Sequence, residues 1–286
     1  MADKVKRESG EYWHLNPMSY FTDTANEDFF TTTDRKFYKW AFYLCEDGRY
    51  EYRGNKYVAN FDTWEPLSNS PPLSKFIDFG ALSQKKILEV GVGVGALFAY
   101  LCKYGQGYGI DFTPNAALLT RQRLNKFKLD GRVYLADAEN LPFKSNTFDC
   151  VVSWGVLHHT PDTLKAINEI WRCMKPGGIT YVMLYHKISL VFLVSVIRDL
   201  FRGRVYNGTF TADCLDPEGK GAPISKAYTV GEVKKLFKNF SDVSIKIDGH
   251  PSSVVIPSIA AHIVPIKLIN RLRKKIGWFL LIKAHK

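Results

Sequence analysis

The feature that most constrains this fold is a regular alternation of strand-like and helix-like segments between residues 85 and 186. Short apolar runs predict strands at 85–90, 107–111, 132–138, 148–155 and 179–185. Helical patterns separate these strands at 95–104, 113–127 and 161–174. Strands that alternate with helices at this spacing are typical of a parallel, doubly wound α/β sheet.

Local signals place the ends of two of these helices. Thr113 followed by Pro114, and Thr160 followed by Pro161, each have the pattern of an N-cap and a first helical residue. The Lys-Pro-Gly-Gly sequence at 175–178 is expected to end the second helix, because glycine and proline do not continue one.

The rest of the chain does not show this alternation of strands and helices. Residues 1–84 are rich in aromatic side chains, so we expect an N-terminal extension, with helices at 34–44 and 71–82, that covers the site. Residues 85–286 are expected to form the main domain. Within it, 188–228 is expected to be an insertion, with an apolar helix at 188–201 and a long polar loop at 207–227.

The C-terminal part carries weaker signals. Thr229 and Glu232 have the spacing of a capping box, which predicts a helix that runs to residue 240. Further strands are expected at 243–247 and 278–284, with a helix at 258–276 between them.

A glycine-rich turn follows the first strand of the alternating region. Gly91, Gly93 and Gly95 allow positive φ and close approach of a ligand, and the helix that follows offers free backbone amides. Asp111 lies 20 residues after Gly91, at the end of the next strand. This pattern fits a nucleotide-like ligand, and the glycine spacing alone is compatible with either NAD or S-adenosylmethionine.

Six motifs in order make the pattern more specific. They are Glu-Val-Gly-Val-Gly-Val-Gly at 89–95, Gly-Ile-Asp at 109–111, Asp-Ala-Glu with Leu-Pro-Phe at 137–143, Phe-Asp at 148–149, Gly-Val-Leu-His-His at 155–159 and Met-Lys-Pro-Gly-Gly at 174–178. Together they resemble the class I S-adenosylmethionine-dependent methyltransferases of the ubiquinone/menaquinone C-methyltransferase-like superfamily. The resemblance covers about a third of the chain. It implies a Rossmann-like, seven-stranded sheet that is mostly parallel with a reversed last strand.

The resemblance also implies roles for individual residues at the cofactor site. Glu89 would orient the methionine ammonium, Asp111 would accept hydrogen bonds from the ribose hydroxyls, and Asp137 would accept one from the adenine amino group. The full set of implied cofactor-binding residues is Glu89, Gly91, Gly93, Gly95, Asp111, Phe112, Asp137, Ala138, Ser153, Trp154 and Gly155.

Three histidines are candidates for a general base, since histidine titrates near neutral pH. They are His158, His159 and His186. If His158 and His159 continue a strand, neighbouring side chains point to opposite faces and at most one faces the site. Tyr20, Tyr185 and His186 are candidates to contact the substrate.

The aromatic extension and the apolar insertion predict a small, apolar or aromatic methyl acceptor, with O-, N- and C-methylation all open. An RNA methyltransferase would explain the net charge of +11, but neither an Asn-Pro-Pro-Tyr motif nor a cytosine-type Pro-Cys motif is present. A non-catalytic protein that binds S-adenosylmethionine is a third possibility. An NAD oxidoreductase ranks below these three, because no Tyr-x-x-x-Lys set follows.

Charge and composition address location. No signal-like segment is present and the longest apolar run has ten residues, so we expect a cytoplasmic protein. The basic, apolar segments 188–204 and 263–281 are compatible with peripheral membrane contact, although packing on the sheet is favoured. Five scattered cysteines without a Cys-x-x-Cys pair argue against disulfides and metal binding. The pattern does not indicate an oligomeric state.

Overall fold

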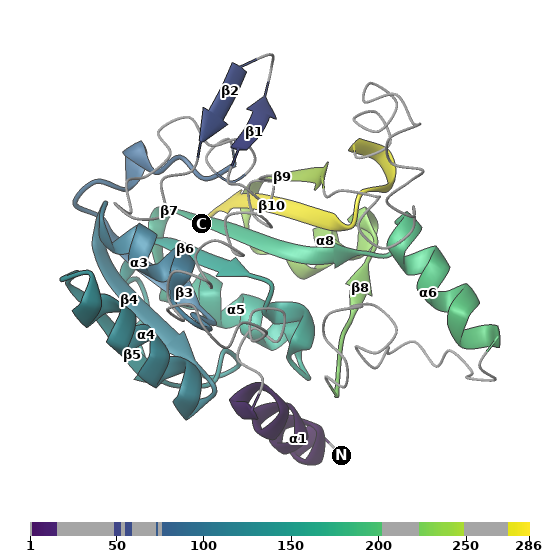
Figure 1. The fold of residues 1–286 in the computed structure, drawn as a ribbon, viewed down its shortest axis with the longest axis horizontal. Helices are drawn as coiled ribbons and strands as arrows, with labels where there is room; N and C mark the ends of the chain where they lie inside the picture. Colours follow the sequence, from purple (N-terminus) through teal and green to yellow (C-terminus); the bar gives the residue numbers. More distant parts are fainter. Residues whose placement is uncertain are drawn as a thin grey trace.

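The structure, a computed structural model, describes residues 2–15, 49–52, 55–58, 73, 76–201, 223–248 and 274–286 (Figure 1). Several expectations lie outside these residues: the helix at 34–44, Tyr20, most of the loop at 207–227 and most of the helix at 258–276.

The described part of the chain is built on one mixed sheet. Its strands are β3 (Lys86–Val90), β4 (Gln106–Asp111), β5 (Gly131–Leu135), β6 (Phe148–Trp154), β7 (Met174–His186), β9 (Ser241–Asp248) and β10 (Phe279–His285). They lie in the order β5-β4-β3-β6-β7-β10-β9. The first five strands are parallel, and β10 is antiparallel to both β7 and β9. The mostly parallel sheet with a reversed last strand is therefore confirmed.

The sheet also contains a strand that the sequence did not predict. β8 (Ala227–Tyr228) pairs in parallel with Tyr185 and His186 at the end of β7, so the sheet has eight strands rather than seven. Two residues are too few to show alternation, so only the tertiary pairing reveals this strand.

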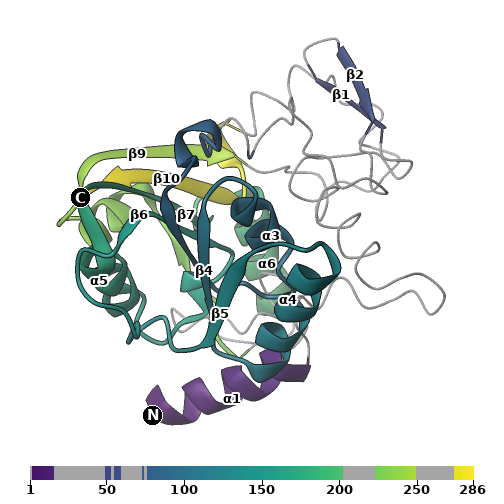
Figure 2. The same cartoon turned by 90° about the vertical axis from the view of Figure 1, so that its left-hand side faces the viewer.

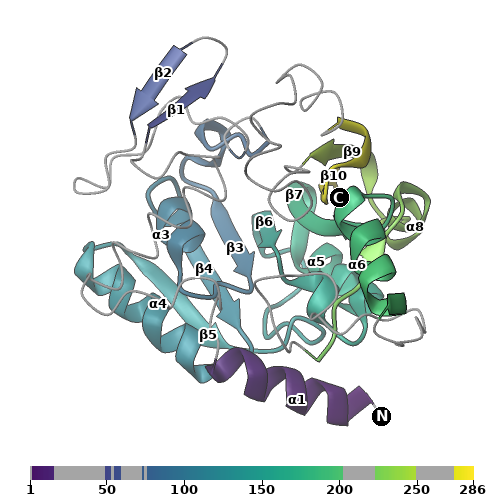
Figure 3. The same ribbon diagram turned by 45° about the vertical axis from the view of Figure 1, so that its right-hand side comes forward.

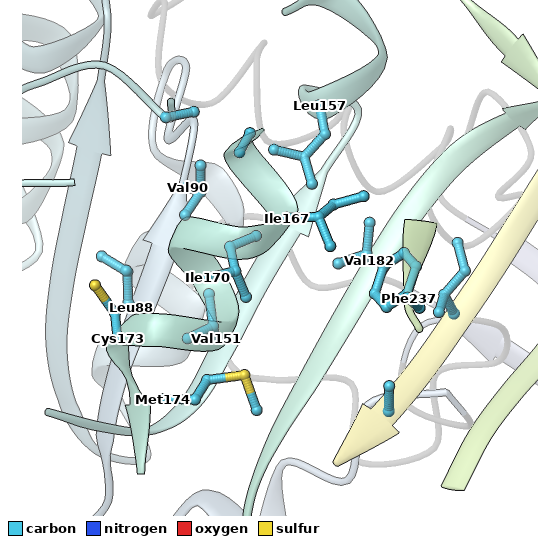
Figure 4. Packing of buried hydrophobic residues seen from close by; sticks show 14 of the residues in the cluster. Leu88, Val90, Val151, Leu157, Ile167, Ile170, Cys173, Met174, Val182 and Phe237 are labelled. Atoms are coloured by element: carbon cyan, nitrogen blue, oxygen red, sulfur yellow. The ribbon is translucent and has the colours of Figure 1, made fainter. Parts of the chain in front are cut away.

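Helices cover both faces of the sheet, as expected for a doubly wound fold. α3 (Ala96–Cys102) and α4 (Pro114–Lys126) lie on one face, and α5 (Thr163–Cys173) lies on the other (Figure 2). Side chains from β3 alternate between the two cores: Ile87 packs with the α3 and α4 side, and Leu88 packs with α5 and α8 (Val230–Leu236) (Figure 4).

Two further groups of elements lie outside this layered core. α1 (Ala2–Leu15), the hairpin of β1 (Arg49–Tyr52) and β2 (Asn55–Val58), and the 3₁₀ turn η2 (Gly80–Leu82) precede the sheet. α6 (Leu190–Phe201) follows β7, where an apolar helix was expected. None of the helices in the described residues is both long enough and apolar enough to span a bilayer.

The helix caps follow the sequence signals with one exception. Thr113 accepts a hydrogen bond from the amide of Ala116, and the capping box of Thr229 and Glu232 is complete. The prediction that Thr160 caps α5 is wrong. Asp162 is the N-cap and accepts from the amide of Lys165 at 2.9 Å, whereas the Thr160 hydroxyl donates to the Leu157 carbonyl at the preceding 3₁₀ turn.

The glycine turn after β3 is held from below by α4. Gly95 has a φ of +79°, and Cβ at this position would lie 2.7 Å from the Thr120 side chain. Thr120 cannot easily move aside, because its hydroxyl donates to the Gly93 carbonyl at 2.9 Å. The fully buried Arg123 donates from Nε to the Val94 carbonyl at 2.7 Å. Two side chains of α4, Thr120 and Arg123, therefore support the last two peptide groups of the turn.

We expect Gly95→Ala to lower the free energy of unfolding by about 2–4 kcal/mol, because it adds a collision with Thr120 to the cost of positive φ. Gly177→Ala is the matched control: Gly177 has a φ of +73°, but nothing lies within 4 Å of its Cβ position. That variant should lose about 1 kcal/mol from backbone strain alone. Urea unfolding measures both, and equal losses would show that Thr120 does not constrain the turn.

Candidate active site

A cavity of about 180 Å³ opens at the edge of the sheet to which the parallel strands β3, β4, β6 and β7 point. Residues of the glycine turn and of α1 line it, and α1 lies next to the ends of these strands (Figure 3). Such an edge is where parallel α/β sheets bind ligands, since loops and helix N-termini converge there. The topology therefore places the candidate site where the sequence placed it.

Most of the expected cofactor-binding residues line this one cavity. They are Glu89, Gly91, Gly93, Asp111, Phe112, Asp137, Ala138, Trp154 and Gly155. Two others do not line it. Gly95 lies beneath the turn as the N-cap of α3, and the Ser153 hydroxyl donates to the Val90 carbonyl at 3.0 Å, which ties β6 to β3.

Glu89 places a buried carboxyl group at the end of β3. The residue is 3% exposed, and among the described residues its Oε2 has no hydrogen-bond partner. Burial, together with the nearby Asp111, raises the pKa of this carboxyl well above its ordinary value. An unpartnered carboxyl oxygen in a cavity wall is stabilised by a ligand that brings a positive charge or a hydrogen-bond donor.

Asp111 orients its carboxylate through bonds to the turn and to the start of α4. Oδ2 accepts from the Gly93 amide at 2.9 Å, and Oδ1 accepts from the amide and hydroxyl of Thr113 at 3.0 Å. Burial raises the pKa of Asp111, and these hydrogen bonds oppose that shift. The side chain is thus fixed at the cavity wall, and a second lone pair of Oδ2 is the place for a hydroxyl group of a ligand.

A third acidic group lies after β5. Asp137 accepts from the Glu139 amide through Oδ1, while its Oδ2 forms an ion pair with Lys6 of α1. The sequence did not predict that Lys6, Ser9 and Trp13 line the cavity. Lys6 resembles any lysine on a charged helix, and only the aromatic character of the extension indicated that it covers the site.

The histidine pair lies on the 3₁₀ turn η3 (Leu157–His159), after β6 has ended at Trp154, so the alternation of faces along a strand does not apply to it. His159 nevertheless lines the cavity and His158 does not. Nδ1 of His159 lies 2.8 Å from the Ile224 carbonyl. A carbonyl only accepts, so Nδ1 carries the proton and Nε2 keeps a lone pair.

The two other candidate histidines are buried outside the cavity lining. The His158 ring stacks on Tyr185 with centroids 3.8 Å apart. Nδ1 of His186 lies 2.9 Å from the Gly277 carbonyl, which fixes its ring at the junction of β7 and β10. Both rings therefore support neighbours of the site.

The wall opposite the acidic groups is apolar and aromatic. Tyr185, Trp154 and Met183 line it from β6 and β7, and Trp13 packs edge-on against His159 at 5.0 Å. Tyr185 was predicted and Met183 was missed. The alternation of side chains along a strand contained the signal, since Met183 shares the face of Tyr185 two residues away.

We expect the buried histidines to make folding stability depend on pH. Burial lowers the pKa of His159 to about 4, below the value of about 6.5 for an unfolded chain. The unfolded state therefore binds more protons between these values, and stability falls as pH drops from about 6.5 to about 4. The loss assigned to His159 is on the order of 3 kcal/mol.

Urea unfolding of His159→Gln at several pH values measures this contribution, and its stability should fall less steeply on acidification than that of the native chain. The exposed His14 provides the matched control as His14→Gln. An unchanged slope in His159→Gln would contradict the assignment.

Comparisons with known proteins agree with this geometry. Residues 88–182 match the family model described as a methyltransferase domain. The chain is 36% identical over 148 residues to a demethylmenaquinone methyltransferase of Lactiplantibacillus plantarum, covering 43% of this chain and 62% of that protein. It is 28% identical over 173 residues to phosphoethanolamine N-methyltransferase 2 of Caenorhabditis elegans, covering 58% of this chain and 35% of that protein. The chain thus spans between about a third and just under two thirds of these relatives.

Solved structures show the same fold. An S-adenosylmethionine-dependent methyltransferase of Methanosarcina mazei aligns with a TM-score of 0.54 at 21% identity, over 77% of this chain and 99% of that one. A second such enzyme, from Mesorhizobium loti, aligns with a TM-score of 0.51 at 18% identity, over 73% and 96% of the two chains. The predicted Rossmann-like methyltransferase fold is confirmed.

Proposed function

We propose that this chain, whose residues 88–182 form a methyltransferase domain, transfers the methyl group of S-adenosylmethionine to a small acceptor with an apolar or aromatic body. The observation that carries the proposal is the pair of carboxyl groups, the buried Glu89 and the half-buried Asp111, that line one cavity beside the glycine turn. Asp111 alone would also suit the ribose of NAD, so Glu89 is the residue that favours S-adenosylmethionine, because its carboxyl group offers the pyrophosphate of NAD no positive charge.

The cavity residues fit the cofactor part by part. The unpartnered Oε2 of Glu89 is suited to the methionine ammonium, and Asp111 is suited to the ribose hydroxyls. Phe112 and Ala138 border the place for adenine, and Asp137, which pairs with Lys6 in this structure, is the carboxylate suited to its amino group. A Cβ on Gly91 would collide with the Val156 side chain, so the turn tolerates no larger residue there.

When bound, S-adenosylmethionine supplies an electrophilic methyl group on its sulfonium. The chain's own task is then to orient the acceptor and to exclude water. Trp154, Met183 and Tyr185 form the apolar wall that would hold the acceptor against the ends of β6 and β7. Binding to this wall removes water from the acceptor and aligns its nucleophilic atom.

His159 is the one of the three candidate histidines that borders this space in the described residues. Its Nε2 lone pair is suited to accept a hydrogen bond from an acceptor O–H or N–H group. Because burial lowers the pKa of His159 to about 4, the ring is neutral near pH 7 and is a weak base. We assign it the role of orienting the nucleophile, with His158 and His186 as positioning residues.

We infer the class of acceptor from the side chains of this apolar wall. The relatives do not indicate it, because their names refer to chemically different molecules. A small apolar or aromatic acceptor fits a cavity lined by indole, phenol and thioether groups better than a nucleic acid strand does. Within this proposal, residues 1–84 cover the site, and the segments 188–204 and 263–281 are candidates for peripheral membrane contact. α6 contributes the exposed Leu193 and Ile197 to such a contact.

Isothermal titration calorimetry with S-adenosylmethionine and with NAD tests the cofactor. We expect binding of the former, and a loss of about 5- to 150-fold in Asp111→Asn from weakened hydrogen bonds to a charged group. Asp149→Asn is the matched control, because Asp149 pairs with Lys175 and does not line the cavity. Binding of NAD alone would contradict the proposal.

Incubation with methyl-labelled cofactor and metabolite extracts tests the acceptor, and we expect label in small apolar molecules. Once an acceptor is found, His159→Phe should lower turnover about tenfold, the effect of one lost hydrogen bond, with little change in cofactor affinity. Titration of His159 should not change the turnover rate of the native chain between pH 6 and 8, because its pKa of about 4 lies below this range. Label found in RNA alone would favour the nucleic-acid alternative.

A further inference from the structure

α1 presents one face to the cavity. Lys6, Ser9 and Trp13 all line it, and their spacing of three and four residues places them on the same side of a helix. Figures 1 and 3 both show α1 lying across the edge of the sheet where β3 and β4 end.

Lys6 occupies the acidic end of the cavity. Its Nζ lies 2.5 Å from Oδ2 of Asp137 and 2.8 Å from Oε2 of Glu139. The lysine side chain is one-quarter exposed, so the pair is shielded from much of the solvent. Burial by itself lowers the pKa of Lys6, but the two carboxylates raise it above its ordinary value overall, so the ammonium keeps its charge.

Further contacts hold α1 along its length. Gly10 packs on the Phe112 ring, where an added Cβ would lie 2.8 Å from a ring carbon. The side-chain amide of Asn115 donates to the His14 carbonyl at 3.0 Å. With Trp13 against His159, α1 reaches from the acidic end of the cavity to the aromatic end. It therefore covers both proposed binding regions at once.

The volume of the cavity is small for a nucleoside ligand. The cavity holds about 180 Å³, whereas sites for ligands of this size class enclose roughly 300–1,000 Å³. Lys6, Ser9 and Trp13 of α1 are among the side chains that bound this space. We therefore expect a nucleoside ligand to displace this helix.

We propose that α1 is a latch that competes with the cofactor, with the Lys6 ammonium holding the carboxylate that would otherwise receive the adenine amino group. The inference rests on the proposed function, which assigns Asp137 to adenine. The apparent dissociation constant of the cofactor is then the intrinsic constant divided by the fraction of molecules with α1 released. Breaking the ion pair raises that fraction and tightens binding.

Calorimetry with S-adenosylhomocysteine tests the latch. We expect Lys6→Met to bind this probe about three to ten times more tightly than the native chain, because it removes the two partly exposed ion pairs of Lys6 with Asp137 and Glu139. Added salt should tighten binding to the native chain, because it screens the pair, and should leave Lys6→Met unchanged. Lys4→Met is the matched control: it removes the same charge from the same helix, but Lys4 is exposed and pairs only with Glu8 among the described residues.

Hydrogen exchange of the ligand-free protein provides a second readout. Amides of α1 should exchange faster in Lys6→Met than in Lys4→Met, and the sheet should be equally protected in both. Unchanged or weaker probe binding in Lys6→Met would overturn the latch, and so would unchanged exchange of α1. If no variant binds the probe while α1 is still loosened by Lys6→Met, the proposed function fails but the docking of α1 by Lys6 stands.

Discussion

The site depends on one hydrogen bond, from the Gly93 amide to the Asp111 carboxylate, because it joins the turn after β3 to the end of β4. That bond fixes an amide group of the glycine turn, while Thr120 and Arg123 of α4 donate hydrogen bonds to two of its carbonyl groups. Asp111 also anchors the start of α4 through Thr113. The same carboxylate therefore shapes the turn, sets the position of the helix that supports it, and faces the cavity.

Sequence reasoning predicted the parts of this arrangement that are coded locally. The burial of β3 is nearly continuous from Ile87 to Val90, as in a strand covered on both faces, and its run of apolar residues was readable without a structure. The glycines of the turn were equally clear, since positive φ selects that residue. Parallel strands meet at one edge, so the carboxyl groups after β3 and β4 could be placed together before any contact was known.

One of the parts that failed depends on a local hydrogen bond, and the others depend on tertiary contacts. Thr160 has the sequence of an N-cap, but its hydroxyl is already bonded to Leu157, so Asp162 begins α5. All three histidines are buried, but only His159 of the three lines the cavity, and its ring is fixed by the Ile224 carbonyl, 65 residues away in the chain. Lys6 shows the same limit, because nothing near it in sequence indicates Asp137, from which it is separated by more than a hundred residues.

Through these long-range contacts, α1 touches both ends of the cavity. Lys6 meets the acidic end and Trp13 meets His159, so outward movement of a single helix exposes the proposed cofactor and acceptor regions together. A ligand covered by α1 would be shielded from water at both ends, where the electrophilic methyl group on the sulfonium would otherwise be exposed to solvent. Because Lys6 and adenine need the same carboxylate, α1 can cover a bound cofactor only in a shifted position or with Lys6 bonded to Glu139 alone, and Oε2 of Glu139 at 2.8 Å is placed to allow the second arrangement.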